Sequence, residues 1–462
     1  MHNSKISGRL WFNLILFGLV GQLAWNVENM YFNTFLYNKI YSGGVSQAAI
    51  DGTMPVMSAI SIMVGLSAAT AVITTFVMGT LSDRLHRRKL FISVGYILWG
   101  VITAMFGLIS REHIAALFHL SDEVKILTVT VWTVILMDCL MTFMGSTSND
   151  SVFNAWVTDV TAPENRPTVE TVFAALPVVA AAAVVGVGSL AQSGVIGYDV
   201  FFLGLGGFVI LSGVVGLFTL EEPEHQIRQS NANYWSDLFY GFRPSVIRAN
   251  PQLYLALATL GFFAIAVQVF FPYLLIYLQY VILPASADLQ FTSASFIVCA
   301  ALSVAIMAAG IIVLLKIGGK NKSHALIPGA VCFVVGLVGL FFARNLQTML
   351  LAIAPTVVGY AVLMILVNAS VRDFTPEDKA GQFQGIRMIF YVLLPMVIGP
   401  MLGNLSSASS SVHYTDEYGV AQSVPTAAMF LCAAAVAVLV FLPLAFLIRK
   451  GFRVSHDAEE TV

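Results

Sequence analysis

The sequence predicts an all-α integral membrane protein in which twelve transmembrane helices form two six-helix bundles related by a pseudo-two-fold axis. Three observations lead to this fold class. Of the 462 residues, 58% are hydrophobic and 10% are charged, whereas a soluble protein carries about 25% charged residues. Apolar stretches of roughly 20 residues, each long enough to cross about 30 Å of hydrocarbon, recur along the chain. The two halves of the chain also share a sequence pattern.

The apolar stretches define the elements in chain order. The predicted spans are 10–38, 55–81, 89–110, 125–157, 169–193, 198–220, 252–282, 291–316, 324–343, 347–371, 382–404 and 424–448. They divide the chain into an N-terminal bundle (1–220), a polar linker (221–251) and a C-terminal bundle with its tail (252–462). The YWSDLFYGF portion of the linker can form a helix at the membrane interface. Pro272 and Pro395 are expected to kink the seventh and eleventh spans.

The basic residues are distributed unevenly between the loops. With the N-terminus inside, 19 of the 23 face the cytoplasm, and only Lys39, Arg111, Lys125 and Arg344 lie outside. Because Lys and Arg accumulate in cytoplasmic loops, we expect a multi-pass protein of the cell membrane with both termini in the cytoplasm. The four cysteines lie inside apolar segments at no metal-ligand spacing, so neither disulfides nor a metal site is expected.

A repeat connects the two halves. NAWVTDVTAPENR at 154–166 matches NASVRDFTPEDK at 368–379, and each segment closes the fourth span of its half. When the first spans of the halves are aligned, Tyr37 falls on Tyr277 and Glu28 falls on Gln268. Six-plus-six repeats build a large class of secondary transporters whose substrate site lies near the bilayer midplane. The alternative is an inert helical scaffold, in which buried polar groups would have no use.

The loop between the second and third spans reads GTLSDRLHRRK, residues 79–89. It resembles the signature of the major facilitator superfamily, and the resemblance extends over essentially the whole chain. Gly79 would let two helices approach closely. The resemblance implies an interdomain latch of Gly79, Asp83, Arg84, Arg87 and Arg88 at the cytoplasmic side; taken alone, such a turn would be only a solvated surface. KIGGKNKSH at 316–324 is its second-half counterpart and lacks the Asp.

Within the superfamily, the chain distantly resembles the glycoside–pentoside–hexuronide:cation symporters, the melibiose-carrier group. VMGTLSDR after the second span, MDC at 137–139 and the interfacial linker carry this resemblance, and Asp138 falls on the group's fourth-span aspartate. The chain has Ala71 and Thr75 at the positions of two sodium-binding aspartates, and Leu23 at that of an acidic sugar ligand. Sodium coupling through that site is therefore not expected.

Three acidic residues, Glu28, Asp138 and Asp150, lie well inside predicted spans, and no histidine does. Glu28 and Asp138 lie midway along the first and fourth spans, which face the central cavity in the fold that the chain resembles. Since apolar surroundings favour the neutral form of a carboxyl group, both are predicted to couple proton movement. The rival interpretation is a structural ion pair, for which Arg387 lies too near the cytoplasm. Asp150, Asp159, Glu170 and Arg387 are predicted to belong to the latch or gate, although Arg387 could simply orient its helix.

Polar side chains also repeat at helical spacing in these spans, at Gln22, Asn26, Asn29 and Asn33 and again at Asp138, Thr142, Gly145 and Asn149. Amides can donate to and accept from hydroxyl groups, and aromatic rings can stack on a sugar; the alternative is that the amides hold neighbouring helices together. The predicted substrate-binding residues are Gln22, Trp25, Asn26, Asn29, Asn33, Trp132, Thr142, Asn149, Gln268, Tyr273, Tyr277, Tyr360, Asn368 and Tyr391.

These features predict a secondary active transporter, not an enzyme, that takes up a sugar or glycoside by proton symport through alternating access. No GxxxxGK[ST] loop for ATP is present. The alternatives are a proton-coupled exporter of amphipathic small molecules, a receptor or scaffold with this fold, and a carrier of nucleosides or organic anions. The expected partners are a small-molecule substrate and the lipid bilayer. Nucleic acid, a metal and a cofactor are not expected, the proton is the coupling ion, and the chain is expected to be a monomer.

Overall fold

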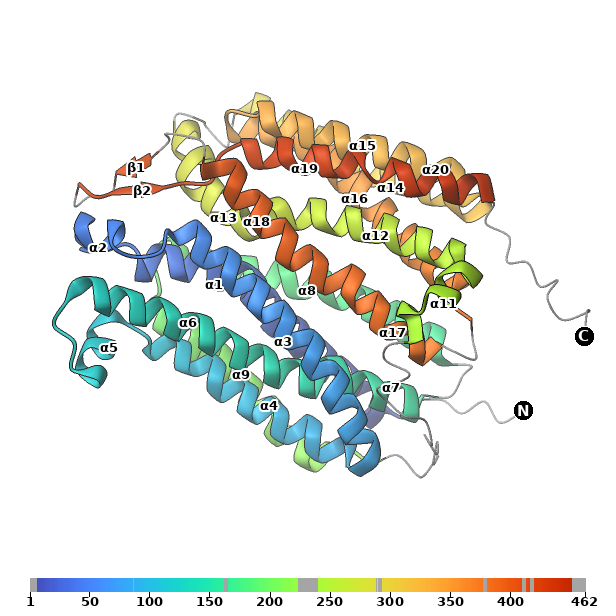
Figure 1. Cartoon of the computed structure of the whole chain (residues 1–462), viewed down its shortest axis with the longest axis horizontal. Helices are drawn as coiled ribbons and strands as arrows, with labels where there is room; N and C mark the ends of the chain where they lie inside the picture. The colour runs from blue at the N-terminus through green and yellow to red at the C-terminus, as the bar shows by residue number, and fades with distance from the viewer. Residues whose placement is uncertain are drawn as a thin grey trace, which may run out of the picture. The chain divides into compact units, whose positions relative to one another are not determined.

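The computed structural model is helical along nearly its whole length (Figure 1). It describes residues 6–85, 87–161, 165–222, 240–287, 289, 293–376, 380–408, 413–415 and 419–450. Two compact units make up the chain: Met1–Asn231 with Thr415–Ala421, and Ala232–Tyr414 with Gln422–Val462.

Twelve helices of the described residues are long and apolar enough to cross a membrane. They are Gly8–Ile40, Val56–Gly79, Arg88–Leu108, Glu123–Val160, Thr171–Ala191, Tyr198–Thr219, Pro251–Ile282, Ala294–Lys320, Lys322–Phe342, Leu346–Phe374, Gly385–Ala408 and Ala428–Lys450. Every end lies within four residues of the predicted span. The predicted fold class is therefore confirmed.

The first unit contains six of these spans. Its elements are α1 (Gly8–Phe35), η1 (Leu36–Ile40), α2 (Gln47–Asp51), α3 (Val56–Leu85), α4 (Arg88–Met105), η2 (Phe106–Leu108), α5 (Arg111–Phe118), α6 (Glu123–Gly145), η3 (Ser146–Phe153), α7 (Asn154–Val160), α8 (Arg166–Gln192) and α9 (Tyr198–Thr219). Side-chain caps define several starts: Ser7 accepts from Leu10 N at the start of α1, and Asp122 accepts from Val124 N at the start of α6.

The second unit contains the other six spans. Its elements are η5 (Tyr240–Phe242), α11 (Pro244–Ala249), α12 (Pro251–Phe270), η6 (Phe271–Tyr273), α13 (Leu274–Tyr277), η7 (Leu278–Ile282), η8 (Pro284–Ser286), α14 (Ala294–Lys320), α15 (Lys322–Phe342), α16 (Leu346–Phe374), α17 (Ala380–Met388), η10 (Ile389–Leu393), α18 (Leu394–Ala408), α19 (Ala428–Val438) and α20 (Phe441–Lys450). The short strands β1 (His413–Thr415) and β2 (Ala421–Ser423) pair with each other. Of the predicted interfacial helix, only Tyr240–Phe242 belongs to the described residues, so that prediction lies outside them.

Glycine allows the tightest helix contact of the first unit. A Cβ atom on Gly100 of α4 would lie 2.5 Å from the carbonyl oxygen of Gly206 of α9, and the converse distance is the same. The two backbones can approach this closely only because neither residue has a side chain. Aromatic packing continues one turn toward the start of α9, where the rings of Phe202 and Phe106 lie 5.7 Å apart and that of Phe32 stacks 3.9 Å from Phe106.

Irregular helical turns occur at equivalent positions of the sequence repeat and near prolines. A π-helical turn ends the first span of each unit, at η1 and η7. Tyr37 lies inside η1, and its aligned counterpart Tyr277 directly precedes η7. Pro272 lies in the 3-10 turn η6 within the seventh span. Pro395 is the second residue of α18, two residues after the π-helical turn η10 in the eleventh span. Pro272 therefore lies where its helix departs from α geometry and Pro395 lies two residues after such a departure; the kinks themselves stay predictions.

Candidate functional site

The fourth span contains a polar segment, η3 (Ser146–Phe153), that contributes to the candidate site. Serine and threonine hydroxyls in η3 donate to carbonyls of their own helix, from Thr147 to Phe143 and from Ser148 to Met144, both at 2.7 Å. Such bonds compete with the backbone ladder of a helix. The chain is π-helical at this point, and single π-helical turns inside α-helices occur frequently at functional sites.

Glu28 of α1 is buried, with 7% of its surface exposed. Its Oε1 atom accepts from Ser67 Oγ of α3 and from Thr142 Oγ1 of α6, each at 2.8 Å. The two hydroxyl oxygens lie 2.6 Å apart. Three transmembrane helices therefore meet at one carboxyl oxygen.

Asp138 lies one helical turn from Thr142 on α6, and 2% of its surface is exposed. Its carboxyl group and that of Glu28 are close enough to interact electrostatically. Among the described residues, Oε2 of Glu28 and Oδ1 of Asp138 have no hydrogen-bond partner, and no ion pair recorded between described residues includes either group. An unpaired buried carboxylate is costly, so this acid pair is suited to bind a proton. We call Glu28, Asp138, Ser67 and Thr142 the acid cluster.

Asn149 is the centre of a second group of polar contacts. Its Oδ1 accepts from Trp25 Nε1 at 3.3 Å, and its Nδ2 donates to the Tyr96 hydroxyl at 2.7 Å. Tyr96 in turn donates to the carbonyl oxygen of Phe17 at 2.7 Å. A side chain on Gly21 would collide with the Asn149 amide, so glycine is needed for α1 to approach η3 here.

The predicted amide stripe lies on a different face of α1 from Glu28. Asn26, Asn29 and Asn33 each donate from Nδ2 to the carbonyl oxygen four residues earlier, at 2.7, 2.8 and 3.0 Å. Gln22, Asn26 and Asn29 are half-buried and Asn33 is buried. In the fourth span, by contrast, Asp138, Thr142, Gly145 and Asn149 are all buried inside the unit. Trp132 is 41% exposed.

In the second unit, three of the predicted residues are linked through Met364 and Asn368, and a fourth packs against Phe263. Asn368 Nδ2 donates to the Met364 carbonyl at 2.8 Å, and Tyr391 OH approaches Met364 Sδ at 3.6 Å. Arg387 Nη2 donates to Asn368 Oδ1 at 3.3 Å. The rings of Tyr360 and Phe263 lie 5.6 Å apart. Arg387 is thus bonded inside its own unit to an amide.

Three predicted residues of the second unit take part in helix packing. Tyr273 is fully buried and donates to the Pro400 carbonyl at 2.9 Å. The ring of Tyr277 lies 5.4 Å from that of Phe430. A Cβ atom on Gly399 would lie 2.5 Å from Gln268. Substrate binding by these residues stays a prediction.

The signature loop is connected to the end of the fourth span. Arg88 pairs with Asp159, Nε to Oδ2, at 3.1 Å and donates from Nη1 to Ser82 Oγ at 2.7 Å. A Cβ atom on Gly79 would lie 3.1 Å from Ser151 Oγ, in accord with the close approach predicted there. Arg87 is exposed.

For the other predicted gate residues, the structure gives few contacts. The side chains of Asp83, Arg84 and Glu170 lie outside the described residues. Asp150 accepts from Ser146 Oγ at 3.0 Å.

The second unit repeats the ion pair of the first. Lys322, at the start of α15, binds Oδ2 of Asp373 near the end of α16. Asp373 is the sequence counterpart of Asp159. In both units, a basic residue at the start of the third span therefore pairs with an aspartate at the end of the fourth span.

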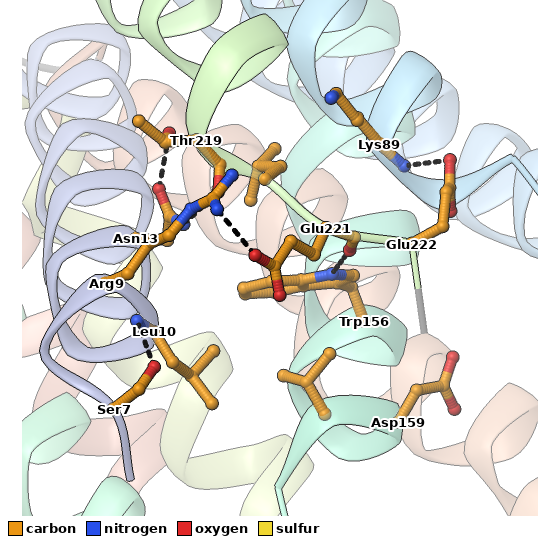
Figure 2. A pocket seen from close by; sticks show the side chains of 12 residues that line it. Ser7, Arg9, Leu10, Asn13, Lys89, Trp156, Asp159, Thr219, Glu221 and Glu222 are labelled. Atoms are coloured by element: carbon orange, nitrogen blue, oxygen red, sulfur yellow. Dashed lines mark hydrogen bonds and ion pairs between the residues drawn. The ribbon is translucent and has the colours of Figure 1, made fainter. Parts of the chain in front are cut away.

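A cavity of about 770 Å³ opens at the end of the first unit where α1 begins and α7 and α9 end (Figure 2). Its polar lining residues are bonded to other groups of the protein. Arg9 pairs with Glu221 at 2.6 Å and donates to the carbonyls of Thr219 and Phe218. The Asn13 amide and Thr219 exchange hydrogen bonds of 2.9 and 2.7 Å. We interpret these contacts as ties between helix ends.

Ser67 is the site residue that the sequence analysis missed. A serine in an apolar span can bond its own helix, so its presence alone does not indicate a site. The one signal in the sequence is that Ser67 lies seven residues before Thr74, which places both hydroxyls on the same face of the helix; both are buried. Its role depends on the crossing of α3 with α1 and α6.

Twelve helices that are long and apolar enough to cross a membrane define a multi-pass membrane protein. The chain belongs to the Major Facilitator Superfamily, whose family model matches residues 10–400, and it carries out secondary transport by alternating access. No curated protein sequence matches the chain. The comparisons thus confirm the superfamily and give no support for the melibiose-carrier group.

Solved structures share the fold at low sequence identity. A bacterial homologue of the human lysosomal transporter Spinster, inward-facing and unoccupied, has a TM-score of 0.62 and 15% identity over 98% of this chain and 100% of that chain. Its inward-facing, occupied form has a TM-score of 0.62 and 14% identity over the same shares. A variant of the nucleoside transporter NupG has a TM-score of 0.60 and 13% identity over 94% of this chain and 99% of that chain.

Proposed function

We propose that this protein couples the uptake of a sugar or glycoside to proton entry, with Glu28 as the proton carrier and Asp138 as its partner. The observation that carries the proposal is the acid cluster. Two buried carboxyl groups share a site in which one oxygen of each has no hydrogen-bond partner among the described residues. Two close carboxylates without a cation are stable only if at least one of them holds a proton.

The amide stripe supports a hydroxyl-rich substrate. Asn26 and Asn29 each use one amide hydrogen on their own helix, and an amide group has two hydrogens and an acceptor oxygen. The remaining hydrogen and the oxygen can bind a ligand hydroxyl. Sugars and nucleosides both present such hydroxyls, and NupG, a fold neighbour, is a nucleoside transporter.

A second candidate is a proton-coupled exporter of amphipathic molecules. The ring contact of Tyr360 with Phe263 and the contact of Tyr391 with Met364 in the second unit favour it, since aromatic and thioether groups suit a ligand with an apolar part. The two candidates differ in the direction of substrate movement relative to the proton.

The test is the external pH of weakly buffered cells that express the protein, during addition of sugars, glycosides and nucleosides one at a time. One compound is expected to make the medium more alkaline, and Glu28→Gln should abolish this response. Exchange of the labelled compound should persist in Glu28→Gln because glutamine is a neutral isostere of the protonated carboxyl group. Glu112→Gln, at an exposed position outside the spans, is the matched control. Efflux of amphipathic dyes with no uptake of any of the compounds would favour the exporter.

We also propose that the protein lies in the plasma membrane with both termini in the cytoplasm. The excess of basic residues in the loops on that side supports this orientation. Protease protection of tags at both termini in intact cells is the expected result. Digestion of either tag from outside would contradict it.

A further inference from the structure

The acid cluster contains three short oxygen–oxygen contacts that form a triangle. Glu28 Oε1 lies 2.8 Å from Ser67 Oγ and 2.8 Å from Thr142 Oγ1, and the hydroxyl oxygens lie 2.6 Å apart. All three distances are those of O–H···O hydrogen bonds. Each oxygen comes from a different transmembrane helix, α1, α3 or α6.

Counting hydrogens decides the state of the carboxyl group. Each hydroxyl carries one hydrogen and an ionised carboxylate carries none. If Glu28 is ionised, only two hydrogens are available for the three contacts. One pair of oxygens then has no hydrogen between them, and their lone pairs repel. A hydrogen on Oε1 of Glu28 removes this conflict because each oxygen then donates once and accepts once.

No other described residue is a hydrogen-bond donor to the three oxygens of the triangle. Asp138, Cys139 and Asp150 are the titratable groups of the fourth span that interact electrostatically with Glu28. The charged or phenolic groups of the neighbouring helices bond elsewhere: Tyr96 of α4 donates to Phe17 O, Arg166 of α8 to Thr158 O, and Tyr198 of α9 accepts from Asn38. On α3, the Thr70 hydroxyl donates to the Leu66 carbonyl.

We propose that Ser67 and Thr142 close a ring of three hydrogen bonds with Glu28 only while Glu28 carries its proton. Both are therefore positioning residues that hold the coupling proton and join α1 to α3 and α6 in the proton-loaded carrier. The inference rests on the proposed function in taking Glu28 as the proton carrier. On release, the O–H bond of Glu28 breaks, its electron pair stays on the carboxylate, and the proton passes to water. One side of the triangle then lacks a hydrogen, so a side chain must rotate or the helices must separate.

The test is a pH titration of the full-length protein in lipid nanodiscs, followed by infrared difference spectroscopy. The carbonyl band of the protonated Glu28 carboxyl group is assigned by its loss in Glu28→Gln. Ser67→Ala and Thr142→Val should each lower the proton affinity of Glu28 about tenfold, since each removes a hydrogen bond to the acid form. Thr142→Ser keeps the hydroxyl and should keep the wild-type midpoint.

Thr130→Val is the matched control, because the buried Thr130 hydroxyl donates only to the Ile126 carbonyl of its own helix. An increase in proton affinity in Ser67→Ala and Thr142→Val would overturn the ring, since it would mean that the hydroxyls donate to an ionised carboxylate. An unchanged midpoint, or no Glu28 band at any pH, would also overturn it. The titration does not depend on flux, so the expected shifts without proton-coupled uptake would reject the proposed function alone.

Discussion

Arg88 binds Asp159 through its guanidinium Nε, 3.1 Å from Oδ2, and thereby connects the start of the third span to the end of the fourth. The Arg88 side chain is 13% exposed and that of Asp159 is 39% exposed. A second bond from Arg88 to Ser82 extends the connection to the end of α3. The loop of the superfamily signature therefore ties three helices of one unit together.

Removal of Arg88 is expected to destabilise the first unit. A double-mutant cycle of Arg88→Ala and Asp159→Ala should give a coupling energy of about 1 kcal/mol, the upper part of the range for partly exposed ion pairs. Thermal unfolding of the purified protein in detergent measures it. Arg87→Ala, at the exposed neighbouring position, should change the unfolding temperature little. Equal effects of the two arginines would contradict the assignment.

The counterpart in the second unit should behave in the same way with a smaller energy. Lys322 binds Asp373, whose side chain is 52% exposed, so a coupling of about 0.5 kcal/mol is expected. Lys322→Asp combined with Asp373→Lys should recover stability that either single reversal loses. Lys320→Asp serves as the control because this exposed residue lies two positions away on α14. A double reversal no more stable than the single ones would refute the pair.

Asn149 is expected to be the costliest amide of the first unit to replace. Asn149→Leu leaves Trp25 Nε1 without its contact to Oδ1 and removes the bond to Tyr96. An unsatisfied buried polar group costs about 1–3 kcal/mol, so the free energy of unfolding should fall by about this amount. Asn154→Leu, at an exposed position whose amide bonds only its own helix, should have little effect. Similar unfolding curves for the two variants would show that the Asn149 contacts do not stabilise the unit.

A pair of glycines on α8 tests the packing of α8 against α1. A Cβ atom on Gly188 would overlap the ring of Tyr31, whereas none on Gly186 meets an atom within 4 Å. Gly188→Ala should destabilise the protein by about 1–3 kcal/mol through overpacking. Gly186→Ala should be neutral or stabilise by up to about 1 kcal/mol, since alanine favours a helix. Thermal unfolding compares the two, and a tolerated Gly188→Ala would refute the close contact.

The sequence predicted some site residues but not their partners. Glu28 and Asp138 were identified because a carboxyl group within an apolar run is conspicuous, and both proved to be buried in one cluster. Ser67 was not identified, since a serine can satisfy its hydroxyl on its own helix. Tyr273 and Tyr277 show the opposite case: aromatic residues suited to ligand binding by their chemistry bond and pack within the core of the second unit.

The sequence by itself determined the twelve spans, their boundaries to within four residues, the repeat and the superfamily. These follow from hydropathy, turn chemistry and short motifs, which are properties of neighbouring residues. Only the tertiary structure decided that Ser67 and Thr142 converge on one oxygen of Glu28, and that Lys322 binds Asp373 as Arg88 binds Asp159. Such contacts join residues tens of positions apart, and they depend on how each helix is rotated and where it crosses the next.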